Sequence, residues 1–142
     1  MSEIVVDASV AVCWFAREAE TERANRLIAA ANALVAPSLL LLEVAGVLWK
    51  KVRRGEMDGD VAGAGLREIR RFVPQIVDDA ELADAALALA RELDHPVYDC
   101  VYLSLARRRN APLVTLDRTF TARLAGTRYR DDAVLLADWA NP

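Results

Sequence analysis

Short apolar runs alternate with longer amphipathic segments along the whole chain. The runs are rich in β-branched residues or leucine, and they predict strands at residues 4–6, 34–36, 75–77, 113–115 and 133–136. Between them, apolar residues recur at helical spacing, which predicts helices from Ala8 onward and at about residues 20–31, 39–54, 60–72, 80–93, 98–109 and 118–124. Short strands that alternate with helices are typical of an α/β fold with a mainly parallel sheet.

Capping and helix-breaking residues mark the ends of these elements. We expect Pro37 to stop the second strand and Ser38 to cap the helix that follows, which Gly55 then ends. Asp79 and Asp117 stand at the starts of two further predicted helices, where their carboxylates can accept free backbone N–H groups.

Length and composition predict one domain over residues 1–142, because 142 residues with 54% hydrophobic side chains suffice for one core. The longest apolar stretch, residues 33–49, is interrupted by Pro37 and Glu43 and is shorter than the roughly 20 apolar residues of a membrane span. Glu3 interrupts the start of the chain, so we expect no signal peptide. Cys13 and Cys100 lie in apolar helical patterns, which is typical of buried, reduced cysteines. We therefore expect a soluble cytoplasmic protein with no membrane partner.

Four carboxylates lie inside or at the end of apolar runs: Asp7, Glu43, Asp99 and Asp117. An ionised carboxylate removed from water without a partner costs several kcal/mol, so it is normally neutralised, paired or bound to a metal. Asp7 and Asp117 follow predicted strands, and sites in parallel sheets form at the carboxyl ends of strands. If the four converge, their all-oxygen ligands favour magnesium or manganese.

Taken singly, these residues differ in how strongly they indicate a site. Asp7 and Asp117 can simply cap helices, and Asp99 near a helix start can interact with the helix dipole. Glu43 has no such explanation, because its neighbours at helical spacing form an apolar face: Leu39, Leu40, Gly46 and Val47. A carboxylate in that position needs a partner.

The balance of charge is acidic overall, with a formal net charge of −3, which is not typical of a nucleic-acid-binding module. Basic residues nevertheless form three local groups: Lys50-Lys51 with Arg53-Arg54; Arg67 with Arg70-Arg71; and Arg107-Arg108-Arg109. Two interpretations remain open. The groups are either solvated helix ends that interact favourably with the helix dipole or contacts for phosphate.

Four segments carry a resemblance to a known family: Val-Val-Asp-Ala-Ser-Val-Ala-Val, Pro-Ser-Leu-Leu-Leu-Leu-Glu-Val, Val-Tyr-Asp-Cys-Val-Tyr-Leu-Ser-Leu-Ala and Leu-Val-Thr-Leu-Asp. In this order and at these separations they resemble the successive motifs of the PIN-domain family. The length is similar to that of the VapC-like ribonuclease toxins of bacterial type II toxin–antitoxin pairs.

The resemblance implies a single PIN-like domain that acts as a Mg²⁺-dependent or Mn²⁺-dependent endoribonuclease and hydrolyses RNA phosphodiester bonds. The family's catalytic and metal-binding acidic positions fall on Asp7, Glu43, Asp99 and Asp117. Magnesium usually takes only one or two direct carboxylates, so we expect Asp7 and Asp99 to be the direct ligands. Glu43 and Asp117 would complete a second site or orient water.

Two hydroxyl residues and three partners complete these expectations. Ser9 and Thr115 fall where the family places small hydroxyls near the metal. We expect them to fix the rotamers of the metal-binding carboxylates by hydrogen bonds, without binding the metal themselves. The resemblance implies an RNA substrate, a cognate antitoxin and a homodimer. We expect the antitoxin to cover apolar surface near residues 55–65 and to block the acidic pocket with a basic side chain.

Other classes of site match the sequence poorly. A receiver domain needs paired acids after the first strand, but Ala8 follows Asp7, and a dehalogenase-type phosphatase needs an acid where Ser9 stands. One histidine, His95, and two distant cysteines do not suggest zinc. The alternative left open is a catalytically inactive PIN-like subunit that only binds a partner.

Overall fold

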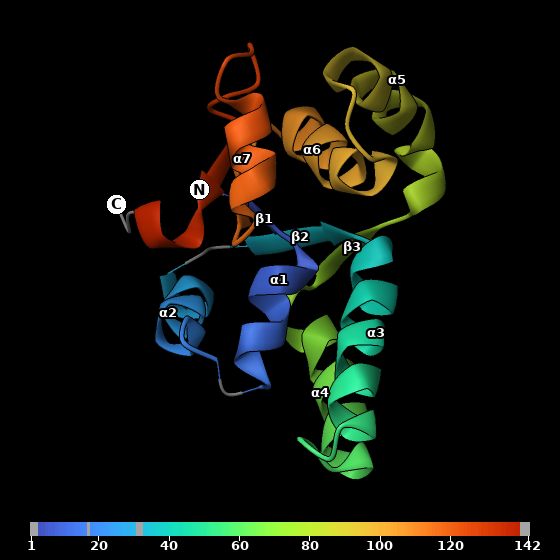
Figure 1. Ribbon diagram of the computed structural model, residues 1–142, viewed down its shortest axis with the longest axis vertical. Coiled ribbons are helices and arrows are strands. Elements are labelled where there is room, and N and C mark those ends of the chain that lie inside the picture. Colours follow the sequence, from blue (N-terminus) through green and yellow to red (C-terminus); the bar gives the residue numbers. More distant parts are fainter. Residues whose placement is uncertain (1–2, 17, 31–32, 140–142) are drawn as a thin grey trace.

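The computed structural model describes residues 3–16, 18–30 and 33–139, which form three layers with a sheet in the middle (Figure 1). The described strands are β1 (Glu3–Val6), β2 (Ala33–Pro37), β3 (Gln75–Val77), β4 (Leu113–Thr115) and β5 (Ala133–Leu135). All neighbours pair in parallel, in the order β3-β2-β1-β4-β5. The predicted α/β class with a mainly parallel sheet is confirmed.

Helices cover both faces of this sheet. Below it in Figure 1 lie α1 (Ala8–Ala11), α2 (Thr21–Ala30), α3 (Leu39–Arg53) and α4 (Gly59–Phe72). Above it lie α5 (Ala83–Leu93), α6 (Val97–Arg109) and α7 (Arg118–Leu124). The chain runs outward from β1 to β2 and β3 and then returns to β4, on the other side of β1. Because parallel crossovers are right-handed, this reversal of direction puts the later helices on the opposite face of the sheet. This change of direction places a crevice at the carboxyl ends of β1 and β4.

The helix α6 is the most deeply buried helix around the sheet. Seven consecutive residues, 100–106, are buried, so this helix is enclosed on all sides, as expected of a core helix. It packs against β1, β2 and β4 and is covered by α5. Side chains at the start of α6 are therefore held firmly above the sheet edge.

Predictions for Pro37, Ser38 and Asp79, in the loops after β2 and β3, differ from the structure. Ser38 takes the N-cap position of α3, but its side chain makes no capping hydrogen bond to that helix. Pro37 does not stop β2 but is its last paired residue, opposite Val77, because the next N–H, that of Ser38, donates to the Val77 carbonyl at 2.8 Å. Asp79 does not cap the helix after it. Its carboxylate instead accepts the N–H of Leu39 at the start of α3, at 3.0 Å, while Ser38 Oγ accepts the N–H of Asp79 at 3.0 Å. This reciprocal pair joins two sheet-edge loops.

Other predicted features agree with the structure. Gly55 ends the α3 segment with a φ of 75°, a conformation that favours glycine, and Asp117 caps α7. Cys13 and Cys100 are buried and free. Ala31, the predicted last residue of α2, lies outside the described residues. Within the described ranges, no helix has the length and apolar character that crossing a membrane requires.

Candidate active site

Asp7 lies where β1 ends and α1 begins, in the crevice beside β4. Its Oδ1 accepts hydrogen bonds from Ser9 Oγ at 2.5 Å and from the Val10 N–H at 3.3 Å, and its Oδ2 accepts one from the Thr115 hydroxyl. Burial raises the pKa of Asp7 from its ordinary value of 3.8 to about 6, although these hydrogen bonds lower it. Among the described residues no lysine or arginine forms an ion pair with Asp7, so the carboxylate is satisfied by hydroxyls and a backbone N–H rather than by a cation.

The two hydroxyls that bind Asp7 are themselves fixed by the end of β4. Ser9 Oγ accepts the Leu116 N–H at 3.1 Å, and Thr115 Oγ1 accepts the Asp117 N–H at 3.0 Å. A hydroxyl has one proton to donate, and these backbone N–H groups orient each oxygen so that its proton points to Asp7. The carboxylate is thus held in one orientation from both sides of the crevice.

Glu43 projects from α3, and its partner is Tyr102 on α6. The buried Tyr102 hydroxyl donates to Glu43 Oε1 at 2.6 Å. Burial raises the pKa of Glu43, the bond from Tyr102 lowers it, and the negative charges of Asp99 and Asp79 raise it further. A carboxylate on this apolar helix face requires a partner, as the sequence suggests, and Tyr102 of α6 is that partner.

Asp99, in the first turn of α6, interacts electrostatically with both other carboxylates. Its charge contributes to the raised pKa of Asp7 and to that of Glu43. On its other side, His95 Nε2 and Asp99 Oδ2 form a hydrogen bond of 2.7 Å. The imidazole ring lies on Phe120, with 4.8 Å between the ring centroids, and its side chain is only 11% exposed, against 37% for Asp99. His95 is therefore a structural support for Asp99 and not an exposed loop residue.

Asp117 is placed beside this group and is not equivalent to its other members. Its Oδ1 accepts the Phe120 N–H at 3.0 Å, so one carboxylate oxygen caps α7. Its backbone N–H donates to the Thr115 hydroxyl at 3.0 Å. The structure therefore brings Asp7, Glu43 and Asp99 together and leaves Asp117 at the β4 side of the crevice, linked to Asp7 through Thr115.

These donors suit a hard divalent cation in chemistry, although they do not form a closed cage. Among the described residues, no group of three or more histidine, cysteine, aspartate or glutamate side chains is arranged closely enough to enclose a metal. Mg²⁺ retains several waters and binds through one or two carboxylates, so a closed protein cage is not required. The charge of Asp99 raises the pKa of both Asp7 and Glu43, so a cation beside these three carboxylates would stabilise their ionised forms.

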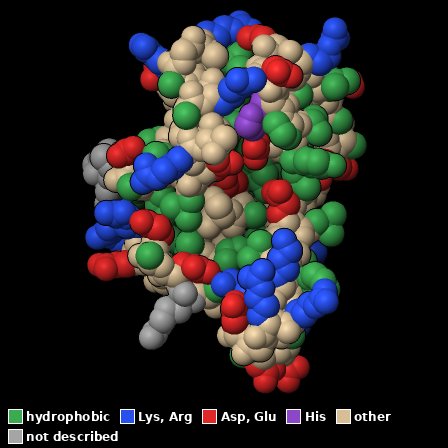
Figure 2. All heavy atoms as spheres, viewed as in Figure 1, with side chains coloured by type: hydrophobic (Ala, Val, Ile, Leu, Met, Phe, Trp, Pro, Cys, Tyr) green, Lys and Arg blue, Asp and Glu red, His purple; other side chains and the backbone are tan. Residues whose placement is uncertain are grey.

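A groove of about 630 Å³ opens beside the carboxylates, between α1 and α3. It begins at Ser9, Glu43 and Leu116 and extends to the segment that holds Glu18 and Glu20. Figure 2 shows acidic side chains in the central part of the visible face, below the histidine, with lysine and arginine side chains farther out. An extended polymer can therefore reach the carboxylates along an open surface.

Sequence reasoning missed three residues of this site. Tyr102 lies three residues after Asp99 on α6, and this helical spacing was the available signal for it. His95 lies four residues before Asp99, in the loop between α5 and α6. Asp79 has no local signal, because its nearness to Glu43 depends on how the loop after β3 packs against the start of α3.

The fold and this constellation define a known class of protein. A family model described as the PIN domain matches residues 4–125, which is most of the chain. The chain belongs to the PIN-domain family.

Individual relatives support this assignment. The chain is 36% identical over 118 residues to Ribonuclease VapC3 of Pyrobaculum aerophilum, covering 82% of this chain and 90% of that protein. The crystal structure of PAE2754 from Pyrobaculum aerophilum has a TM-score of 0.72 at 26% identity and covers 96% of this chain and 85% of that one. A toxin–antitoxin complex from Klebsiella pneumoniae has the same fold, with a TM-score of 0.65 at 16% identity over 94% of this chain and 97% of that one.

Proposed function

We propose that this protein, as one domain over residues 1–142, is a metal-dependent endoribonuclease and the toxin of a VapBC-type toxin–antitoxin pair. The observation that carries the proposal is the half-buried Asp7 carboxylate, whose pKa desolvation raises to about 6. It is oriented by Ser9 and Thr115, interacts with the charge of Asp99, and has no cationic partner among the described residues. The similarity to a ribonuclease over most of both chains supports the same conclusion.

The chain's own residues bind and orient in this mechanism. Asp7 and Asp99 would hold Mg²⁺ or Mn²⁺ directly, and Glu43 and Asp117 would bind a second ion or orient water. When bound, the metal lowers the pKa of water and stabilises charge on the attacking and leaving oxygens of the phosphodiester. Ser9 and Thr115 keep the Asp7 carboxylate in one rotamer.

Tyr102 orients Glu43 in the same way. Burial and the nearby Glu43 raise the pKa of Tyr102 far above its ordinary value. The phenol therefore keeps its proton and remains a donor to Glu43 at every physiological pH.

An antitoxin is the proposed protein partner, since a solved complex of the same fold is a toxin–antitoxin pair. Residues 55–65 comprise the end of the α3–α4 connection and the first half of α4. The helices α3 and α4 expose large apolar side chains: Leu42 (74%), Trp49 (57%) and Val61 (53%). Exposed apolar side chains on two neighbouring helices are typical of a partner-binding surface. A basic side chain of the antitoxin would then pair with the carboxylates in place of the cation.

A homodimer and a cytoplasmic location complete the proposal. Leu87 on α5 and Tyr98 on α6 are exposed apolar residues on the opposite layer, where a second copy can pack without covering α3 and α4. Light scattering of the purified chain tests the dimer. Two buried free cysteines, Cys13 and Cys100, fit a reducing compartment.

Thermal melting during a Mn²⁺ titration tests the metal site and separates the nuclease from an inactive binding subunit. We expect Mn²⁺ to raise the melting temperature of the wild type, because an ion that binds only the folded state stabilises it. Asp7→Asn should abolish that rise. A wild-type melting temperature that does not respond to Mn²⁺ would favour the binding subunit.

A further inference from the structure

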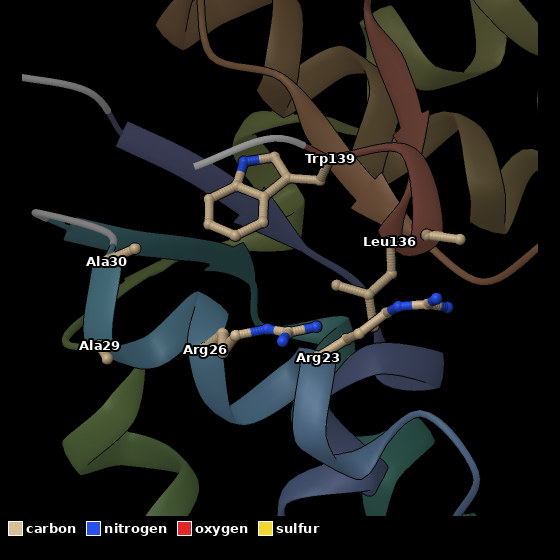
Figure 3. Close-up of a pocket in the computed structure, with 7 residues that line it drawn as sticks. Arg23, Arg26, Ala29, Ala30, Leu136 and Trp139 are labelled. Atoms are coloured by element: carbon tan, nitrogen blue, oxygen red, sulfur yellow. The ribbon is translucent and has the colours of Figure 1, made fainter. Parts of the chain in front are cut away.

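A second cavity, of about 390 Å³, lies between α2 and the segment that follows β5 (Figure 3). Its walls combine two arginines and a tryptophan with small apolar residues: Arg23, Arg26, Ala29, Ala30, Leu136, Ala137 and Trp139. In Figure 3 the Arg26 side chain extends from α2 beneath the indole of Trp139, and the Arg23 side chain extends past Leu136. The cavity therefore offers a flat aromatic surface and planar cations to the same ligand.

The two arginines differ in how much of their hydrogen-bonding capacity is used. Arg23 is paired with Glu20 at 3.0 Å, whereas Arg26 approaches Glu22 only to 3.8 Å and makes no side-chain hydrogen bond to another described residue. The Arg26 side chain is 62% exposed, so its N–H groups face solvent. A guanidinium with free donors in a planar fork suits a phosphate.

One end of the cavity, at Leu136, lies at the sheet edge that holds Asp7. Thr115, which donates to Asp7, is paired across the sheet with Leu135, and the next residue, Leu136, lines the cavity. Neighbouring strands are about 4.8 Å apart, so the cavity begins one strand beyond the active-site crevice. On the other side, Glu20 lines the active-site groove and binds Arg23 in the cavity wall. This ion pair therefore joins the wall of the groove to the wall of the cavity.

We propose that this cavity binds an unpaired nucleotide of the RNA, next to the phosphodiester that is cleaved. The base stacks on the Trp139 indole, and the phosphate is held by Arg26 with help from Arg23. Single-stranded RNA is recognised in this way, by stacking on aromatic side chains and by arginine contacts to the backbone. The inference rests on the proposed function, because it requires RNA in the adjacent groove.

Binding of a fluorescein-labelled single-stranded oligouridylate tests the cavity directly. It is measured by fluorescence anisotropy in the Asp7→Asn background, where cleavage does not interfere. Trp139→Ala should weaken binding about tenfold, whereas Trp139→Phe, which keeps an aromatic face, should stay within about twofold. Arg26→Ala should also weaken binding and reduce the salt dependence by about one phosphate contact. Because Arg26 is mostly exposed, its replacement tests the cavity even where Trp139→Ala perturbs folding.

A matched control exists on α3. Trp49 is exposed and Arg53 lies over its ring at 5.3 Å, yet neither residue lines the groove or the cavity. Trp49→Ala and Arg53→Ala should therefore bind oligouridylate like the Asp7→Asn background. Equal losses at both tryptophan–arginine pairs would overturn the proposal, as would unchanged binding in Trp139→Ala and Arg26→Ala.

This binding assay fails or succeeds independently of the nuclease proposal. Metal-dependent RNA cleavage by the wild type together with unchanged binding in the Trp139 and Arg26 variants would reject the cavity alone. Binding that depends on Trp139, in a protein whose wild type cleaves no RNA, would reject the nuclease and keep the cavity as an RNA-binding site.

Discussion

The Tyr102 hydroxyl donates to Glu43 Oε1 at 2.6 Å, across a sequence separation of 59 residues. This bond orients a carboxylate that projects from an otherwise apolar face of α3. Tyr102→Phe removes only the donor and keeps the ring that packs in the core. We expect RNA cleavage to fall about tenfold, the usual effect of removing a group that orients a metal-binding carboxylate. Steady-state cleavage and the melting temperature together check this, since an activity loss caused by unfolding would lower both.

The pH dependence of stability tests the burial of Asp7. Its pKa is about 6 in the folded protein and near 3.8 when unfolded, so the folded state binds more protons between these values. The free energy of unfolding therefore falls as the pH rises through this window. Asp7→Asn lacks this loss of stability and should be more stable than the wild type by up to about 3 kcal/mol at pH 7. Melting both proteins in EDTA from pH 4 to pH 7 measures it. A stability difference that does not change with pH would contradict the burial of a charged Asp7.

Glu43→Gln and Glu56→Gln form a matched pair of substitutions. Glu56 is exposed and approaches Lys51 only to 3.9 Å, so losing its charge should leave cleavage within about twofold of the wild type. Glu43→Gln should reduce cleavage at least about tenfold. The Tyr102 hydroxyl then donates to a neutral amide, and the metal site loses one negatively charged carboxylate. Indistinguishable activities would show that the apolar surroundings of Glu43 do not mark a functional carboxylate.

Much of this architecture could be predicted from sequence, because it depends on local pattern. Strand positions follow from short β-branched runs, and a carboxylate at the end of such a run lies at the carboxyl edge of a parallel sheet. The nearness of Asp7, Glu43 and Asp99 could be inferred from their apolar flanks, because carboxylates in such surroundings need a common partner such as a metal ion. The apolar flanks of Asp117 are similar, yet the structure uses one of its oxygens to cap α7.

The remainder depends on contacts between distant segments. Asp79 looked like the cap of its own helix, but its carboxylate caps α3, 40 residues earlier. That choice becomes available only when β2 and β3 pair and bring their two loops together. The Trp139 cavity is likewise formed by α2 and the last part of the described chain, and neither segment alone predicts it.

Competition between metal and antitoxin tests how the partner inhibits the enzyme. If a basic antitoxin side chain occupies the carboxylates, high Mg²⁺ should relieve inhibition, while contacts to Leu42, Trp49 and Val61 hold the complex together. RNase activity of the purified complex across a Mg²⁺ series, with size-exclusion chromatography at each concentration, measures both effects. Inhibition unchanged at saturating Mg²⁺, with the complex intact, would place the blocking contact away from the carboxylates.

Cleavage of a labelled RNA by the purified wild type and by Asp7→Asn, each in EDTA and in Mg²⁺ or Mn²⁺, tests the central claim most directly. The account predicts cleavage by the wild type with metal, no cleavage in EDTA, and at least an about hundredfold loss in Asp7→Asn while its fold is retained. Wild-type rates in EDTA, or undiminished cleavage by a folded Asp7→Asn protein, would contradict it.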